Sequence, residues 1–190
     1  AAKTTGVGHI AYRTSPQAAL QRRVAVIESM GCGIGWHEGD AGHGRAYRFH
    51  DPDGHIFELY YDTNVYEAPP QERPALKNLA QRYHGRGVAV RRIDHLNLLA
   101  ADVSVIRDFM TKALGSRVTE QIQLDNGRLG GCWFTVNNKT YDIAYTEDHS
   151  GQRGRFHHIT YAVDQREDVL RAADIFLENG VFIETGPHKH

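Results

Sequence analysis

Three histidines each open a short apolar run that is followed by a helical pattern. They are His9, His95 and His158. Imidazole nitrogen is a common ligand of transition metals, and repeated modules that pack in pairs can aim two such side chains at one point. The pattern therefore predicts a metal site built from repeats. The plainer alternative is that these are core histidines with satisfied hydrogen bonds.

The overall charge excludes several classes of partner. The chain has 190 residues, with 22 Lys and Arg against 23 Asp and Glu, so its formal net charge is −1. This balance gives no electrostatic reason to bind nucleic acid or an anionic membrane. No apolar run approaches the ~18 residues of a membrane-spanning helix, and no signal-peptide pattern is seen. The two cysteines, Cys32 and Cys132, suit a reducing compartment. We therefore expect a cytoplasmic protein.

The repeat is clearest between the first and the last module. His9 and Gly31 recur as His158 and Gly180 at one common offset, which also predicts a strand beginning at Ile183. Each module contains a helical pattern that ends at a glycine, as helices commonly do. The apolar stripes that predict the three helices are Leu20, Val24 and Ile27; Ile106, Met110 and Ala113; and Val169, Ala173 and Phe176.

The helices also have recognisable start signals. Ser, Thr, Asp and Asn cap helix N-termini, Pro favours the first helical position, and a Glu three residues after the cap completes a capping box. The predicted starts are Ser15-Pro16, then Asp102 or Ser104, and then Asp164 with Glu167.

Strand patterns follow the first two helices. In the first module the turn Asp51-Pro52-Asp53-Gly54 separates a strand over 45–50 from a strand over 55–61 that carries Glu58. The middle module has strand patterns over 119–124, 131–136 and 141–145. Each full module is therefore βαβββ, and the predicted fold class is α+β, made of tandem βαβββ modules.

The predicted domain division has three parts. Residues 1–62 form a βαβββ module, the second half of an N-terminal domain. Residues 63–91 form a proline-containing linker, in which a short helix is expected from Pro74 to Leu79. Residues 92–190 form a C-terminal catalytic domain with one full module and one incomplete module.

Five segments of the middle and last modules have a recognisable pattern. They are Ile93-Asp94-His95 and the segments 141–145 (YDIAY), 154–161 (GRFHHITY), 167–174 (EDVLRAAD) and 186–190 (GPHKH). Together with the tandem modules, they resemble the vicinal oxygen chelate superfamily, and within it the type I extradiol ring-cleaving dioxygenases, most of all the catechol 2,3-dioxygenases. That family has four such modules, so the chain looks cut at both ends.

The resemblance implies a non-haem Fe(II) centre, with Mn(II) as a possible replacement. His95 and His158 match the family's two histidine ligands, and the third ligand, a glutamate, is expected beyond residue 190. Such a facial triad leaves positions open for both oxygens of a catechol and for O2. The implied reaction is cleavage of the ring next to the diol, which gives a 2-hydroxymuconic semialdehyde-type product.

Further residues match the family's substrate pocket. Trp133 is expected beside the substrate ring, and His190 is expected to hydrogen-bond the substrate or O2. Tyr141 stands where most of the family has an acid–base histidine. Tyrosine, with a pKa of ~10, carries protons less well near neutrality than histidine at ~6.5, so Tyr141 is expected to orient O2 and substrate while another group moves the proton. A core role for Trp133 or Tyr141 stays open.

Two other residues are expected outside the metal site, and two other functions stay open. His157 should point to the opposite face of its strand and be structural, and Glu58 should be a surface or inter-module residue. The alternatives are a glyoxalase-like metal-dependent isomerase and a non-enzymatic ligand-binding protein of the same superfamily. The resemblance also implies a homo-oligomer, typically a tetramer.

Overall fold

The structure is a computed structural model that describes residues 6–40, 42–73, 75–76 and 87–188. It contains two compact bodies. One comprises Ala1–Val65 and His95–Ile159, and the other comprises Tyr66–Asp94 and Thr160–His190. Among the described residues, no helix is both long and apolar enough to cross a membrane. The short helix expected from Pro74 to Leu79 lies mostly outside the described residues.

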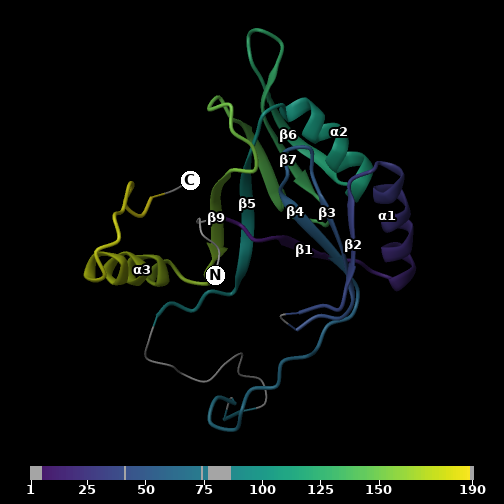
Figure 1. Cartoon of the computed structure of the whole chain (residues 1–190). Helices are drawn as coiled ribbons and strands as arrows, with labels where there is room; N and C mark the ends of the chain where they lie inside the picture. Colours follow the sequence, from purple (N-terminus) through teal and green to yellow (C-terminus); the bar gives the residue numbers. More distant parts are fainter. Residues whose placement is uncertain (1–5, 41, 74, 77–86, 189–190) are drawn as a thin grey trace. The chain divides into compact units, whose positions relative to one another are not determined.

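The first module forms a four-stranded sheet with the order β1-β4-β3-β2 (Figure 1). Strand β1 runs parallel to β4, and the other neighbours are antiparallel. The predicted βαβββ module is therefore confirmed. Its elements are β1 (Ile10–Arg13), α1 (Gln17–Ser29), β2 (Gly33–His37), β3 (Ala46–His50) and β4 (Ile56–Tyr60).

The middle module repeats this topology in a five-stranded sheet with the order β6-β7-β8-β5-β9. Strand β5 is parallel to β8, just as β1 is to β4, and β9 of the last module extends the sheet beside β5. The α+β fold class is confirmed. The elements are β5 (Arg92–Ala100), α2 (Val103–Leu114), β6 (Arg117–Gln123), β7 (Leu129–Thr135), β8 (Ile143–Glu147), β9 (Phe156–Ala162) and α3 (Arg166–Glu178).

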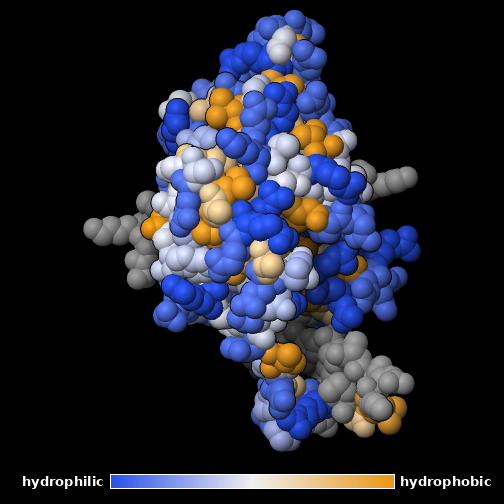
Figure 2. Space-filling model, turned by 90° about the vertical axis from the view of Figure 1, so that its right-hand side faces the viewer, coloured by the Kyte–Doolittle hydropathy of each residue, from blue (hydrophilic) through white to orange (hydrophobic). Residues whose placement is uncertain are grey.

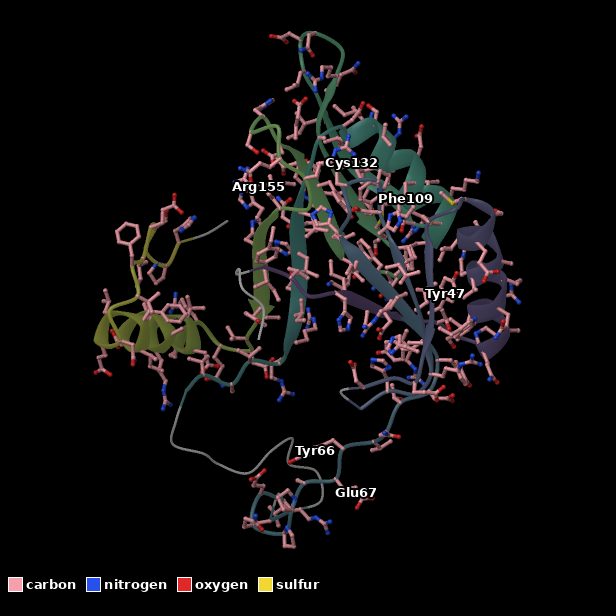
Figure 3. The ribbon with its side chains drawn as sticks, in the orientation of Figure 1. Tyr47, Tyr66, Glu67, Phe109, Cys132 and Arg155 are labelled. Atoms are coloured by element: carbon pink, nitrogen blue, oxygen red, sulfur yellow. The ribbon has the colours of Figure 1, made fainter. Side chains whose placement is uncertain are left out.

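The predicted stripes of α1 and α2 form one core that the two modules share. Figure 1 shows the two helices side by side against the sheets. The stripe residues of both helices are buried, and the rings of Phe49 and Phe109 lie 6.3 Å apart across the module boundary. In Figure 3, Phe109 and Cys132 lie on the α2 side of the sheet. Figure 2 shows hydrophilic side chains over most of the outward face, with scattered apolar patches. Helices α1 and α2 are therefore amphipathic, with the predicted apolar stripes on the buried side.

The helix boundaries follow the sequence signals only in part. Asp102 caps α2, because its carboxylate accepts hydrogen bonds from the backbone of Ser104 and Val105, and Gly115 ends this helix in the left-handed region at φ 68°. Two predicted caps are wrong. The N-cap of α1 is Pro16 rather than Ser15, and the N-cap of α3 is Gln165 rather than Asp164; neither makes a side-chain capping bond. The helix in each case begins one residue later than its signal, where the chain leaves the extended region.

The end of the chain also differs from the prediction. None of the residues of α3 is buried, so its apolar stripe makes no core among the described residues. The strand expected from Ile183 is wrong, because residues 181–188 form no strand. A strand needs a neighbour to take its backbone hydrogen bonds, and no described strand pairs with this segment.

Candidate metal centre

The two predicted histidine ligands lie on neighbouring strands. His95 is on β5 and His158 is on β9. Backbone hydrogen bonds run from Leu99 N to Arg155 O (3.0 Å) and from Arg91 N to Ala162 O (2.9 Å). These bonds bracket the two histidines and place them opposite each other. The first strands of two successive modules therefore meet at this point.

The two imidazoles face each other at a distance that suits a shared cation. The Nε2 atoms of His95 and His158 are 3.3 Å apart, and the ring planes are inclined at 80°. Metal–nitrogen bonds of 2.0–2.1 Å at tetrahedral or octahedral angles put adjacent ligand nitrogens roughly 2.8–3.4 Å apart. The donor atoms are of the right type and at the right separation for one transition-metal ion.

The neighbouring His157 also reaches this group. Its side chain is exposed, and its Nδ1 lies 2.7 Å from Nδ1 of His158. One ring nitrogen of His158 thus faces His157 and the other faces His95. An outer hydrogen bond of this kind fixes the tautomer and orientation of a metal-binding imidazole.

Tyr141 lies close to the same pair. It precedes β8, and its ring centroid is 4.7 Å from that of His95. The adjacent Asp142 anchors this segment, because its carboxylate accepts hydrogen bonds from Thr135 Oγ1 (2.9 Å), Val136 N (3.0 Å) and Asn137 Nδ2 (2.8 Å). Burial raises the pKa of Asp142, but these donors outweigh it and the pKa is lowered overall. The sequence carries no separate signal for Asp142, although Asn137 and Asn138 stand shortly before it.

Trp133 lies on the same face of the sheet as the two histidines. It pairs with Ala144 on β8, and Ala144 pairs with Asn97 on β5, two residues after His95. Side chains two residues apart share a face of a strand. The adjacent Cys132, in contrast, lies in the core. His190 lies outside the described residues.

Glu58 contradicts the sequence expectation. Its side chain is completely buried within the first module, so it is not a surface residue. Arg48 Nε donates to its Oε2 at 2.8 Å, and His37 Nε2 is 2.5 Å from the same oxygen. Burial raises the pKa of Glu58, but these two partners lower it overall. No motif in the sequence identified His37 or His43.

The family comparison agrees with this fold. Residues 92–190 match the model of the Glyoxalase/Bleomycin resistance protein/Dioxygenase superfamily. The chain belongs to this superfamily. The superfamily match covers the middle and last modules, including both histidines of the candidate centre.

Individual superfamily members resemble nearly the whole chain. A metapyrocatechase from Geobacillus stearothermophilus is 38% identical over 185 residues, covering 97% of this chain and 56% of that protein. A manganese-dependent 2,3-dihydroxybiphenyl 1,2-dioxygenase from Geobacillus genomosp. 3 is 37% identical, covering 97% of this chain and 59% of that protein. The crystal structure of the 2,3-dioxygenase LapB from Pseudomonas sp. KL28 superposes with a TM-score of 0.84 at 25% identity, covering 100% of this chain and 65% of that chain. The chain thus spans less than two thirds of the length of each.

Proposed function

We propose that this chain is part of an extradiol dioxygenase that cleaves a catechol ring next to the diol with O2. The observation that carries the proposal is the meeting of His95 and His158, with Nε2 atoms 3.3 Å apart, on the first strands of two modules. The similarity to a metapyrocatechase and to a dihydroxybiphenyl dioxygenase supports it. The product is a 2-hydroxymuconic semialdehyde or its ring-substituted equivalent, which contains both atoms of O2.

His95 and His158 are the proposed ligands of Fe(II), or of Mn(II) as the name of one relative suggests. The proposed third ligand is a glutamate that follows residue 190 in the family's order of elements. When bound, the metal supplies a Lewis acid that lowers the pKa of the catechol hydroxyls and a path for electrons to O2. His157 is proposed to hold His158 in the orientation that aims Nε2 at this position.

The remaining residues act on substrate and protons. Trp133 is proposed to pack beside the catechol ring on the face of the sheet that carries the histidines. The hydroxyl of Tyr141 is proposed to donate a hydrogen bond to a reacting oxygen of the substrate or of O2. His190 is proposed to donate a further hydrogen bond there. Fixed donors of this kind stabilise charge as it develops in the transition state.

The proposal is tested on the whole protein loaded anaerobically with Fe(II). Catechol and air should then give a yellow ring-opened product with uptake of O2. His158→Ala should abolish both. His149→Ala is the matched control, because this histidine is 78% exposed, and it should retain activity. Full activity in His158→Ala would contradict the proposal. A glyoxalase-like isomerase would consume no O2, and a ligand-binding protein would give no product.

Three broader statements belong to the same proposal. We propose that the protein works in the cytoplasm, as a homo-oligomer of the tetrameric type implied by its resemblance. We also propose that residues 92–190 belong to the catalytic domain, that 1–62 belong to an N-terminal domain, and that 63–91 link them.

A further inference from the structure

A second set of metal-ligating side chains lies on the sheet of the first module. Glu58 on β4 pairs with Ala11 on β1, and His9 stands two residues before Ala11, on the same face. Arg48 on β3 pairs with Glu58 from the other side. This sheet is not the one that carries His95 and His158.

The loop between β2 and β3 brings two more ligand types to this face. The loop is tied to the segment after β4, because Gly44 N donates to Asp62 O at 2.9 Å. The ring of His43 stacks on that of Tyr60, with centroids 4.5 Å apart and an angle of 24°. These contacts hold Asp40 and His43 over the strand that carries Glu58.

The donor atoms converge as ligands of one ion would. One donor atom each of His9, Asp40 and Glu58 lies within 4.8 Å of the other two. His43 Nε2 is 3.4 Å from Asp40 Oδ1 and 2.8 Å from Glu58 Oε1. Carboxylate oxygen and imidazole nitrogen together are the donor set of Zn²⁺ and related transition metals.

The two oxygens of Glu58 are not equally satisfied. Oε2 is bonded to Arg48 and lies beside His37. Oε1 is buried and accepts no hydrogen bond from any described residue, and His43 Nε2 lies 2.8 Å from it. A buried carboxylate oxygen without a donor is destabilising, whereas a cation would satisfy it.

We propose that His9, Asp40 and Glu58 bind a divalent transition metal, for which Zn²⁺ is the probe, with the imidazole of His43 beside them. The two carboxylates carry two negative charges, and Arg48, which contacts both of them, offsets one. The free cluster therefore keeps one net negative charge, which attracts a cation. The ion would fasten the β2–β3 loop to β4. This second metal site is independent of the proposed dioxygenase centre.

The test uses a background in which the first centre is removed. His95→Ala/His158→Ala protein, depleted of metal, is titrated with Zn²⁺ by calorimetry and should bind one equivalent. Adding Asp40→Asn should weaken this binding by at least about tenfold, since loss of even an outer partner costs a metal site about 10–100-fold. Asp40 is 55% exposed, so this substitution leaves the fold intact. Glu58→Gln should abolish the binding.

Each outcome decides the proposal. Absence of Zn²⁺ binding in the histidine-depleted background would overturn it, as would binding that Asp40→Asn leaves unchanged. His149→Ala is the matched control for loss of a histidine outside both clusters, and it should leave the Zn²⁺ affinity unchanged. If Glu58→Gln is unfolded by circular dichroism, the Asp40→Asn and His9→Gln variants decide the result. Dioxygenase activity is not measured in this test. A failure of the proposed dioxygenase function is therefore distinguishable from a failure of the proposed second metal site.

Discussion

Tyr141 is the residue whose chemistry departs most from the family pattern. Its ring lies 4.7 Å from His95, and Asp142 beside it is fixed by three hydrogen-bond donors. A phenol in this position is a good hydrogen-bond donor but a poor proton carrier near neutrality, because its reference pKa is ~10. Positioning without proton transfer is therefore the role that its chemistry favours.

We expect Tyr141→Phe in the iron-loaded protein to lower the turnover number about 100-fold, as loss of one transition-state donor commonly does. The iron content should be unchanged, because the hydroxyl is not a proposed ligand. Steady-state O2 uptake and iron analysis measure the two quantities. An unchanged turnover number would exclude the proposed role.

His55 is a buried histidine whose two ring nitrogens both face acceptors. Nδ1 lies 2.8 Å from Asp51 Oδ2, and Nε2 lies 2.9 Å from Arg155 O. Only the protonated ring donates to both. Burial lowers the pKa of His55, but the hydrogen bond and charge of Asp51 outweigh this and raise it overall. The folded protein therefore holds this proton more tightly than the unfolded chain does.

The direction of the pH effect follows from this shift. A raised pKa stabilises the fold fully below the unfolded value of ~6.5, and the stabilisation is lost as the pH rises through the folded pKa. Asp53, whose pKa is raised by burial, acts in the same direction at lower pH. We expect the free energy of unfolding to fall as the pH rises above the unfolded value of ~6.5. The free energy of unfolding, measured with urea at several pH values, should vary less steeply with pH in His55→Gln. An equal pH dependence in the two proteins would contradict this assignment.

Among the elements, α2 has the best-defined ends. Asp102 Oδ1 accepts hydrogen bonds from Ser104 N at 2.8 Å and Val105 N at 3.3 Å. The other two helices described here begin without a side-chain cap. Among the described helices, α2 is therefore the one whose first turn is stabilised by a side-chain cap.

We expect Asp102→Ala to lower the free energy of unfolding by about 1 kcal/mol, because two backbone donors lose their acceptor. Asp102→Asn is the matched control and should cost much less, since asparagine caps helices as well as aspartate does. Urea unfolding measures both. Equal losses in the two variants would mean that the charge of Asp102, rather than its capping bonds, stabilises the helix.

The turn after β3 connects the two modules as well as its own strands. The carboxylate of Asp51 accepts backbone bonds from Asp53 and His55 at 2.9 Å, and it accepts the Tyr145 hydroxyl of β8 at 2.8 Å. Asp51 is only 1% exposed. A motif that reads as a simple turn is thus also a buried bridge between modules.

For the whole molecule, the shared core of the first and middle modules has a consequence for folding. Phe49 of β3 is fully buried and faces Phe109 of α2. Residues 1–65 and 95–159 form one compact body. Elements with a common core are expected to unfold together.

The two tryptophans test this cooperativity. Trp36 lies on β2 of the first module and Trp133 lies on β7 of the middle module. Trp133→Phe and Trp36→Phe each leave one tryptophan. In each variant, we expect the urea midpoint from tryptophan fluorescence to equal the midpoint from circular dichroism. Phe49→Ala should destabilise both modules together by about 3–5 kcal/mol. Two separated transitions would instead support an independent first module.

The sequence alone determined the local structure. The apolar stripes of α1 and α2, the glycines that follow them and the succession of strands along each module depend on short-range periodicity and backbone conformation, which neighbouring residues fix. The placement of His95 and His158 at the start of first strands was predicted on the same basis.

The contacts and the burial of those residues depend on the tertiary structure. The approach of His95 to His158 depends on the pairing of β5 with β9, and the burial of Glu58 among His37, His43 and Arg48 depends on a loop folding over its strand. Burial and ligand convergence are set by residues distant in the chain, so no local pattern specifies them. Glu58 was therefore misassigned to the surface, while the stripe of α2 was predicted correctly.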